Sequence, residues 1–228
     1  MSKKEETEDV IIDLVHCGHF EIDEDKINGW FHPIPLSLWE EIVGFHKSMS
    51  IETKSETVSY HRWNPETEEY DTIIPYQVTS RGGLSVDTDW EAEENVALLD
   101  EYAEKWGTEF FPACTIHTHV DVAAFESGTD AADEEDLPGW HVTLGHLGKG
   151  RKEMDIDFRF RLPKLKKVKE LTTVEDKYDL PIEHLFEEGV LAEEISQCPW
   201  DNTNFNEYKE RVSFHQRQPA KGIRGIAK

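Results

Sequence analysis

Two histidines separated by a single residue, His117 and His119, have the types and spacing best suited to chemistry in this chain. The stretch that contains them, FFPACTIHTH, is rich in β-branched and aromatic residues and predicts a strand. Residues two apart on a strand point to the same face of the sheet, so we expect both imidazoles to face one space. An H-x-H pair by itself is also common among strand histidines that bind no metal.

Two further polar residues, Ser127 and Asp130, follow closely in SGTDAADEED, whose acidic composition predicts the first turns of a helix. Residues three apart on a helix lie on the same side, so Ser127 and Asp130 are expected to share one side. Two neutral imidazoles and a carboxylate, with the fourth position left to water, form the usual catalytic zinc site. We therefore predict that His117, His119 and Asp130 bind Zn2+.

The full string, H-x-H-x7-S-x-x-D, resembles the motif of the JAMM (MPN-plus) zinc metalloproteases and isopeptidases, of the prokaryotic or viral type, and every fixed position is filled. The resemblance implies that a glutamate at the start of a strand after the first helix completes the site. Glu56 stands at that place, with Ser59 where the family pattern E-x-x-G has glycine, and Glu52 is the alternative. The resemblance also implies that the glutamate moves the proton of the attacking water and that Ser127 donates a hydrogen bond to the oxyanion.

The remaining periodicities predict the elements that would position these residues. From Leu36, LSLWEEIVGFHKSM has apolar residues at helical spacing and predicts a helix packed on a sheet. Residues 55–80 predict a β-hairpin, and Asp89 is expected to cap a helix that runs to Trp106. Residues 137–147 and 153–162 alternate as strands. His141 and His146 lie on the first of these and are expected to be structural or to support the ligands rather than bind the metal.

This order of elements predicts an α+β fold, a mixed sheet flanked by helices. It resembles the MPN (cytidine-deaminase-like) fold, with N- and C-terminal extensions. We expect an N-terminal extension at 1–35, a JAMM/MPN-like metalloprotease domain at 36–162 and a C-terminal extension at 163–228. The last of these contains apolar residues that could dock on the core, namely Leu185, Phe186, Val190, Leu191 and Ile195.

The two extensions carry further candidates. His16, Cys17 and His19 form a second metal-like group, but no neighbouring ligand spacing completes a structural zinc site. The tail from Glu207 is basic in an acidic chain, so it is expected to fold back on the acidic residues 121–136 or to contact a partner.

The composition disfavours several partners and compartments. The 24 basic and 48 acidic residues give a net charge of −24, which argues against nucleic acid and against anionic lipid as partners. Three widely spaced cysteines, Cys17, Cys114 and Cys198, fit free thiols in a reducing compartment. The first apolar run is broken by Asp13 and predicts neither a signal peptide nor a membrane span, so a cytoplasmic location is expected.

Three functions are compatible with these features. The first is zinc-dependent hydrolysis of a peptide or isopeptide bond in a protein or peptide substrate, for which the C-terminal tail of a ubiquitin-like protein is one candidate implied by the resemblance. The second is a non-catalytic MPN scaffold in a protein complex, whose members usually lack the metal residues found here. The third is a zinc hydrolase of a small amide, although a deaminase is disfavoured because H-x-E followed by P-C-x-x-C is absent from the sequence.

Overall fold

The computed structural model describes residues 30, 32–64, 67–80, 85–106, 113–134, 137–148, 150, 152–161, 177–179, 182–187, 189–197 and 206–214. The expected group of His16, Cys17 and His19 lies outside these residues, as do Cys198 and the end of the basic tail. Cys114 lies within them and is a buried free thiol.

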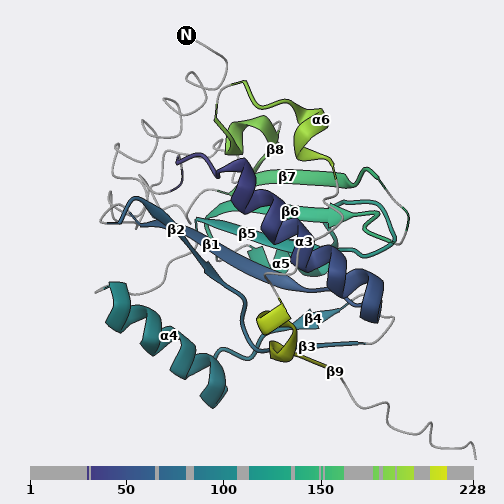
Figure 1. Cartoon of the computed structure of the whole chain (residues 1–228). Coiled ribbons are helices and arrows are strands. Elements are labelled where there is room, and N and C mark those ends of the chain that lie inside the picture. The colour runs from purple at the N-terminus through teal and green to yellow at the C-terminus, as the bar shows by residue number, and fades with distance from the viewer. Residues whose placement is uncertain are drawn as a thin grey trace, which may run out of the picture.

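A six-stranded mixed sheet forms the centre of the fold (Figure 1). Its strands, in spatial order, are β2 (Glu69–Ile73), β1 (Val58–Asn64), β5 (Cys114–Thr118), β6 (Gly139–Gly145), β7 (Asp155–Arg161) and β8 (Lys177–Asp179). Strands β5 and β6 are parallel, and each of the other neighbouring pairs is antiparallel. With helices packed on it, the sheet confirms the α+β class predicted from the sequence.

A small second sheet contains β4 (Val86–Asp87), β3 (Gln77–Thr79) and β9 (Val212–Phe214), in that order. The predicted hairpin is therefore only partly right. Strand β2 already begins at Glu69, in the part expected to be a connection, and the run TIIPYQV is divided between the two sheets. Pro75 lies at the division, and proline lacks the backbone N–H that a central strand requires.

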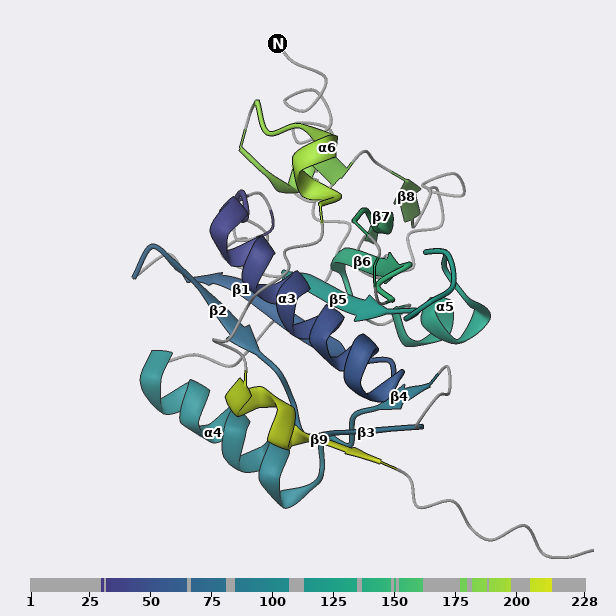
Figure 2. The ribbon, with the colours of Figure 1, turned by 45° about the vertical axis from the view of Figure 1, so that its right-hand side comes forward.

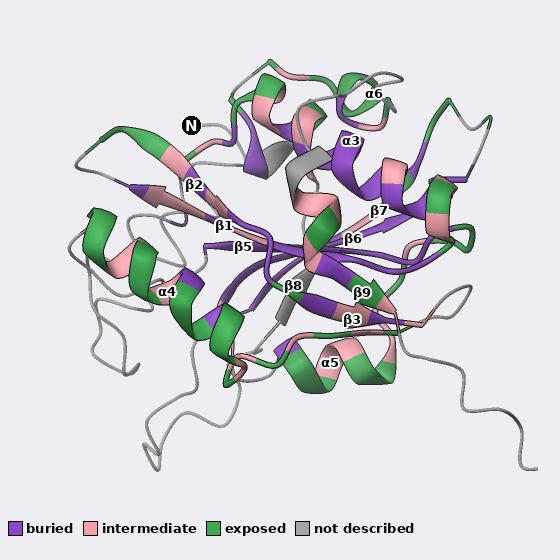
Figure 3. Cartoon of the chain, turned by 60° about the horizontal axis from the view of Figure 1, so that its bottom comes forward, coloured by how far each residue is buried: buried purple, intermediate pink, exposed green. Residues whose placement is uncertain are grey.

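Two helices lie on opposite faces of the large sheet, α3 (Leu36–Thr53) on one and α5 (Gly128–Glu134) on the other (Figures 2 and 3). Helix α4 (Glu93–Trp106) begins three residues later than a cap at Asp89 would place it. Asp89 instead caps the turn before it, since the Glu91 amide donates to Asp89 Oδ1 at 3.0 Å. The short helix α6 (Ala192–Ile195) and the 3-10 helices η3 (Ile182–Leu185) and η4 (Asn206–Arg211) follow β8.

The apolar core lies between α3 and the sheet. The helix buries an apolar side that includes Trp39, Ile42 and Val43, and the facing strands bury Ile116, Val142, Phe158 and Phe160 among others. Leu185, Phe186 and Ile195 belong to the same core, whereas Leu191 is 60% exposed. Val190 is partly buried and packs against this core, so four of the five apolar residues expected to dock do so.

The other face of the sheet is polar. Across the strands, Val58 pairs with His117, His117 with Thr143, and Thr143 with Asp157, so these four residues form one row. Figure 3 shows the buried strands between α3 and α5, and α5 lies on this polar face, where it carries Asp130 beside His117. Among the described helices, none has the length and apolar composition needed to cross a membrane.

Candidate metal centre and pocket

His117 and His119, at the end of β5, and Asp130, in the first turn of α5, meet on the polar face of the sheet. His117 Nε2 lies 3.4 Å from Asp130 Oδ1, and His119 Nε2 lies 3.4 Å from Asp130 Oδ2. One ligand atom from each residue lies within 4.8 Å of the others, so the three residues could hold a metal ion. The structure thus brings together the three ligands predicted from the sequence.

The helix start fixes the direction of the Asp130 carboxylate. The Ser127 amide donates to Asp130 Oδ2 at 2.6 Å, and the Asp130 amide donates to Ser127 Oγ at 3.2 Å. This reciprocal pair has the form of a capping box, in which two amides that lack helical partners are satisfied by side chains. The S-x-x-D spacing therefore has a local structural function in addition to any chemistry.

The charges in this cluster are strongly coupled. Burial acts to raise the pKa of Asp130, but hydrogen bonds with His117 and His119 outweigh it and hold the pKa well below its ordinary value. Burial acts to lower the pKa of His119, but Asp130 and the nearby Glu56 carboxylate outweigh it and raise the pKa. Metal and proton compete for the same imidazole nitrogen, so metal binding here is expected to release protons.

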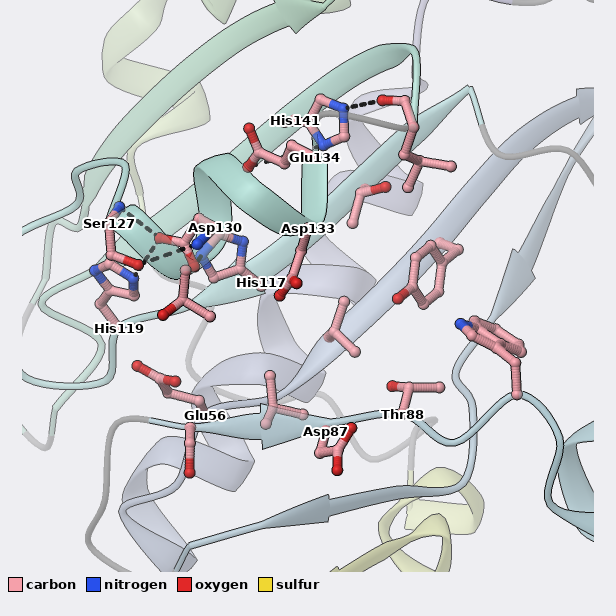
Figure 4. Close-up of a pocket in the computed structure, with 18 of the residues that line it drawn as sticks. Glu56, Asp87, Thr88, His117, His119, Ser127, Asp130, Asp133, Glu134 and His141 are labelled. Atoms are coloured by element: carbon pink, nitrogen blue, oxygen red, sulfur yellow. Dashed lines mark hydrogen bonds and ion pairs between the residues drawn. The ribbon is translucent and has the colours of Figure 1, made fainter.

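Glu56 lies between the end of α3 and the start of β1 and lines the same pocket as the histidines. It is 6% exposed, and burial raises its pKa to about 7. Figure 4 shows its carboxylate across the pocket from Ser127 and Asp130, on the side of His119. Glu52, the alternative, is on the outside of α3, where its side chain is 55% exposed and accepts a hydrogen bond from Lys209 Nζ at 2.6 Å. Of the two glutamates, Glu56 is the one that faces the candidate ligands.

Ser59, where the family pattern has glycine, belongs to a buried hydrogen-bond chain on the opposite face. Its Oγ lies 2.9 Å from His46 Nε2 and 2.9 Å from His61 Nε2, and His46 Nδ1 lies 2.8 Å from Thr57 Oγ1. Burial lowers the pKa of His61 to about 3 and that of His46 well below its ordinary value. Both imidazoles are therefore neutral, and the chain links α3 to the strand that begins beside Glu56. The sequence reasoning did not identify this cluster.

The pocket has a volume of about 710 Å³, and none of the described residues that line it is a lysine or arginine. Its apolar part includes Tyr60 and Trp90, whose ring centroids are 5.2 Å apart, and Phe125, which lies edge-on to His119 at 4.7 Å. Phe125 is 50% exposed at the mouth of the pocket. Three further carboxylates, Asp87, Asp133 and Glu134, also line it (Figure 4).

The sequence reasoning missed these lining residues, because most of them reach the pocket from elements that are distant along the chain. Trp90 and Asp87 come from β4 and the turn that follows it. Phe125, which lies between the H-x-H pair and Ser127, and Asp133, three residues after Asp130, could have been suspected from their positions near the motif.

The two other histidines of the β6 region do not join the three candidate ligands. His141 lines the pocket but donates from Nε2 to the Leu137 carbonyl at 2.7 Å, and burial lowers its pKa to about 4. His146 Nδ1 lies 2.8 Å from Asp155 Oδ2. Both contacts agree with the structural or supporting roles expected for these residues.

Comparison of the chain with protein-family models, with curated proteins and with solved structures found no match. What can be proposed about function therefore depends on the motif and on the geometry of the pocket.

Proposed function

We propose that the protein is a zinc-dependent hydrolase of peptide or isopeptide bonds with an MPN-like fold over residues 36–162. The observation that best supports this is the position of Glu56. A buried carboxylate after the first helix, as the family pattern requires, lines the same pocket as His117, His119 and Asp130. A protein or peptide is the proposed substrate, with the tail of a ubiquitin-like protein as one candidate, and the cytoplasm is the proposed location.

The donor set fits zinc. Two imidazole nitrogens and one carboxylate oxygen, with a further position open, are the ligands typical of catalytic zinc sites. A zinc ion bound there would polarise the substrate carbonyl and lower the pKa of a bound water to about 7. Asp130, whose pKa is held low, would remain a carboxylate ligand throughout the neutral range.

The protein groups would then move the proton and stabilise charge. Glu56 accepts the proton of the attacking water and donates it to the leaving amine, and its pKa of about 7 suits both steps. The Ser127 Oγ accepts a hydrogen bond from the Asp130 amide through one of its lone pairs. The hydroxyl hydrogen is therefore left to donate to the developing oxyanion. The aromatic and aliphatic walls would exclude water from the reacting groups.

A zinc hydrolase of a small amide is the second candidate. The pocket volume of about 710 Å³ falls within the range of small-molecule sites, roughly 300–1,000 Å³. The same zinc, base and oxyanion donor would serve either substrate, so the chemistry alone does not separate the two. The complete set of metal residues weighs against a non-catalytic scaffold.

The test compares zinc-loaded wild-type protein with Glu56→Gln. Both are incubated with a proteome-derived peptide library, with lysine-branched isopeptides and with a set of small amides, and products are identified by mass spectrometry. We expect the wild type to cleave one of these classes and Glu56→Gln to retain zinc but lose nearly all cleavage, because glutamine cannot accept the proton. Equal cleavage by the two proteins, or no cleavage of any class by the zinc-loaded wild type, would contradict the proposal.

A further inference from the structure

Two arginines of β7, Arg159 and Arg161, are buried on the polar face of the sheet, with exposures of 0% and 8%. A buried guanidinium is costly to desolvate, and apolar residues of similar size often stabilise a core equally well. Their presence beside the candidate metal centre therefore points to a role other than stability.

Both arginines bind one glutamate of α5. Arg159 Nε donates to Glu134 Oε2 at 3.2 Å, Arg159 Nη2 donates to Glu134 Oε1, and Arg161 Nε donates to Glu134 Oε2 at 3.1 Å. Glu134 is four residues after Asp130, so the two side chains lie on the same side of the helix, one turn apart. The arginine pair therefore fixes the helix that carries a candidate ligand.

The arginine pair also anchors the residues that directly precede this helix. Arg161 Nη2 donates to Glu126 Oε1, and Glu126 directly precedes Ser127. Residues 126–134, which carry Ser127 and Asp130, are thus anchored to β7 at both ends.

A second connection leads from Arg159 to the histidine side of the site. Arg159 Nη1 and Nη2 each donate to Thr143 Oγ1 at 3.1 Å. Thr143 pairs with His117 across the β5 and β6 ladder, and Thr143 Oγ1 lies 3.4 Å from His117 Nε2. One guanidinium therefore contacts both the helix of Asp130 and the strand neighbour of His117.

We propose that Arg159 and Arg161 are positioning residues that set the spacing between Asp130 and His117 for metal binding. This inference rests on the proposed metal centre but not on the proposed reaction. Residues that orient metal ligands typically change metal affinity ~10–100-fold when they are replaced, since ligand geometry must be held closely.

The decisive variant removes a whole ion pair, Arg159→Met with Glu134→Met. It leaves Arg161 with Glu126, and the freed Asp157 side chain is 29% exposed and can be hydrated. Since no buried charge is left unpaired, this double variant is expected to fold, as thermal unfolding by circular dichroism would show. The matched control is Glu52→Met with Lys209→Met, which removes an ion pair on the outer side of α3.

Metal binding is measured in each protein by zinc titration against a chromogenic chelator and by the visible spectrum of the Co2+ form. We expect the double variant to bind zinc ~10–100-fold more weakly, with an altered Co2+ spectrum, while the control matches the wild type. Arg159→Lys is expected to lose part of the affinity, because an ammonium cannot bind Glu134 and Thr143 in a fork.

Wild-type affinity and spectrum in a folded double variant would overturn the proposal, and so would a wild type that binds no zinc. If the double variant does not fold, zinc affinity and the Co2+ spectrum are measured in Arg159→Lys and Thr143→Val instead. Wild-type values in both of these variants would overturn the proposal. A wild type that binds zinc but cleaves nothing would remove the proposed reaction and leave the positioning role intact.

Discussion

At the scale of single residues, Glu56 combines deep burial with an ionisable group. Burial raises its pKa from 4.5 to about 7, so between these values the folded protein binds a proton that the unfolded chain does not. The contribution of Glu56 to the free energy of unfolding of the metal-free protein therefore falls as the pH rises from about 4.5 to 7.

Replacing Glu56 by glutamine should remove the free-energy cost of burying an ionised carboxylate. Metal-free Glu56→Gln is expected to be more stable than metal-free wild type by roughly 1–3 kcal/mol at about pH 8, with the difference shrinking to near zero below about pH 4.5. Urea unfolding of both proteins across this pH range measures it. A difference that does not change with pH would show that burial does not set the ionisation of Glu56.

Ser127 has two functions that substitution can separate. Ser127→Ala removes the helix cap and the proposed oxyanion donor, so it should lower kcat ~10²–10³-fold on any cleaved substrate and cost about 1 kcal/mol of stability. Ser127→Thr keeps the hydroxyl and should recover most of both. Kinetics and unfolding of the two variants test this, and an unchanged kcat in Ser127→Ala would exclude the serine from the reaction.

The candidate ligands could be predicted from sequence because their spacing is local. Strand alternation orients His117 and His119, and the helix start carries Asp130, whereas Glu56 was predicted only from the resemblance to the family pattern. Arg159 could not be predicted, because its contact with Glu134 depends on the register of β6 with β7 and on the position of α5.

At the scale of elements, long periodic segments were predicted well and short ones were not. Helix α3 begins at the expected Leu36, and β6 and β7 lie in the expected segments. The small sheet was not predicted, because β3 and β4 are very short and β9 reaches β3 from far along the chain. Ser213 Oγ, for example, donates to the Gln77 carbonyl across 136 positions.

The hydrogen-bond chain of His46, Ser59 and His61 connects α3 to β1, and Ser59 is its central member. Ser59→Ala should leave two fully buried imidazoles each without one partner and lower the free energy of unfolding by about 1–3 kcal/mol. In a chain of this length that corresponds to a fall in Tm of roughly 2–4 °C per kcal/mol. Ser213→Ala, at an exposed strand position, is the control. Equal stability of the two variants would mean that the buried chain contributes little.

At the scale of the whole molecule, the segment after residue 162 is structurally joined to the part that carries the motif. Strand β8 extends the large sheet, and Trp39 Nε1 donates to the Ile195 carbonyl at 2.9 Å. Leu185 and Phe186 fill the core beneath α3. The polar face beside the candidate metal centre is thus supported by a core to which both regions contribute.

The net charge of −24 and the absence of lysine and arginine among the described residues that line the pocket favour neutral or basic molecules over acidic ones as substrates of the proposed reaction. The same apolar core should let the fold survive without metal, unlike a zinc finger, so loss of metal and loss of fold can be measured separately.

We propose that His117, His119 and Asp130 hold zinc, and the metal content of the purified protein shows directly whether they do. Protein purified without chelator is analysed for bound metals by mass spectrometry, beside His117→Ala, Asp130→Ala and Glu56→Gln, with circular dichroism to confirm folding. We predict about one zinc per chain in the wild type and in Glu56→Gln, and almost none in the two ligand variants, because the remaining ligands are too few. Folded wild-type protein that contains no zinc and takes up none on titration would show that these three residues do not form a zinc site.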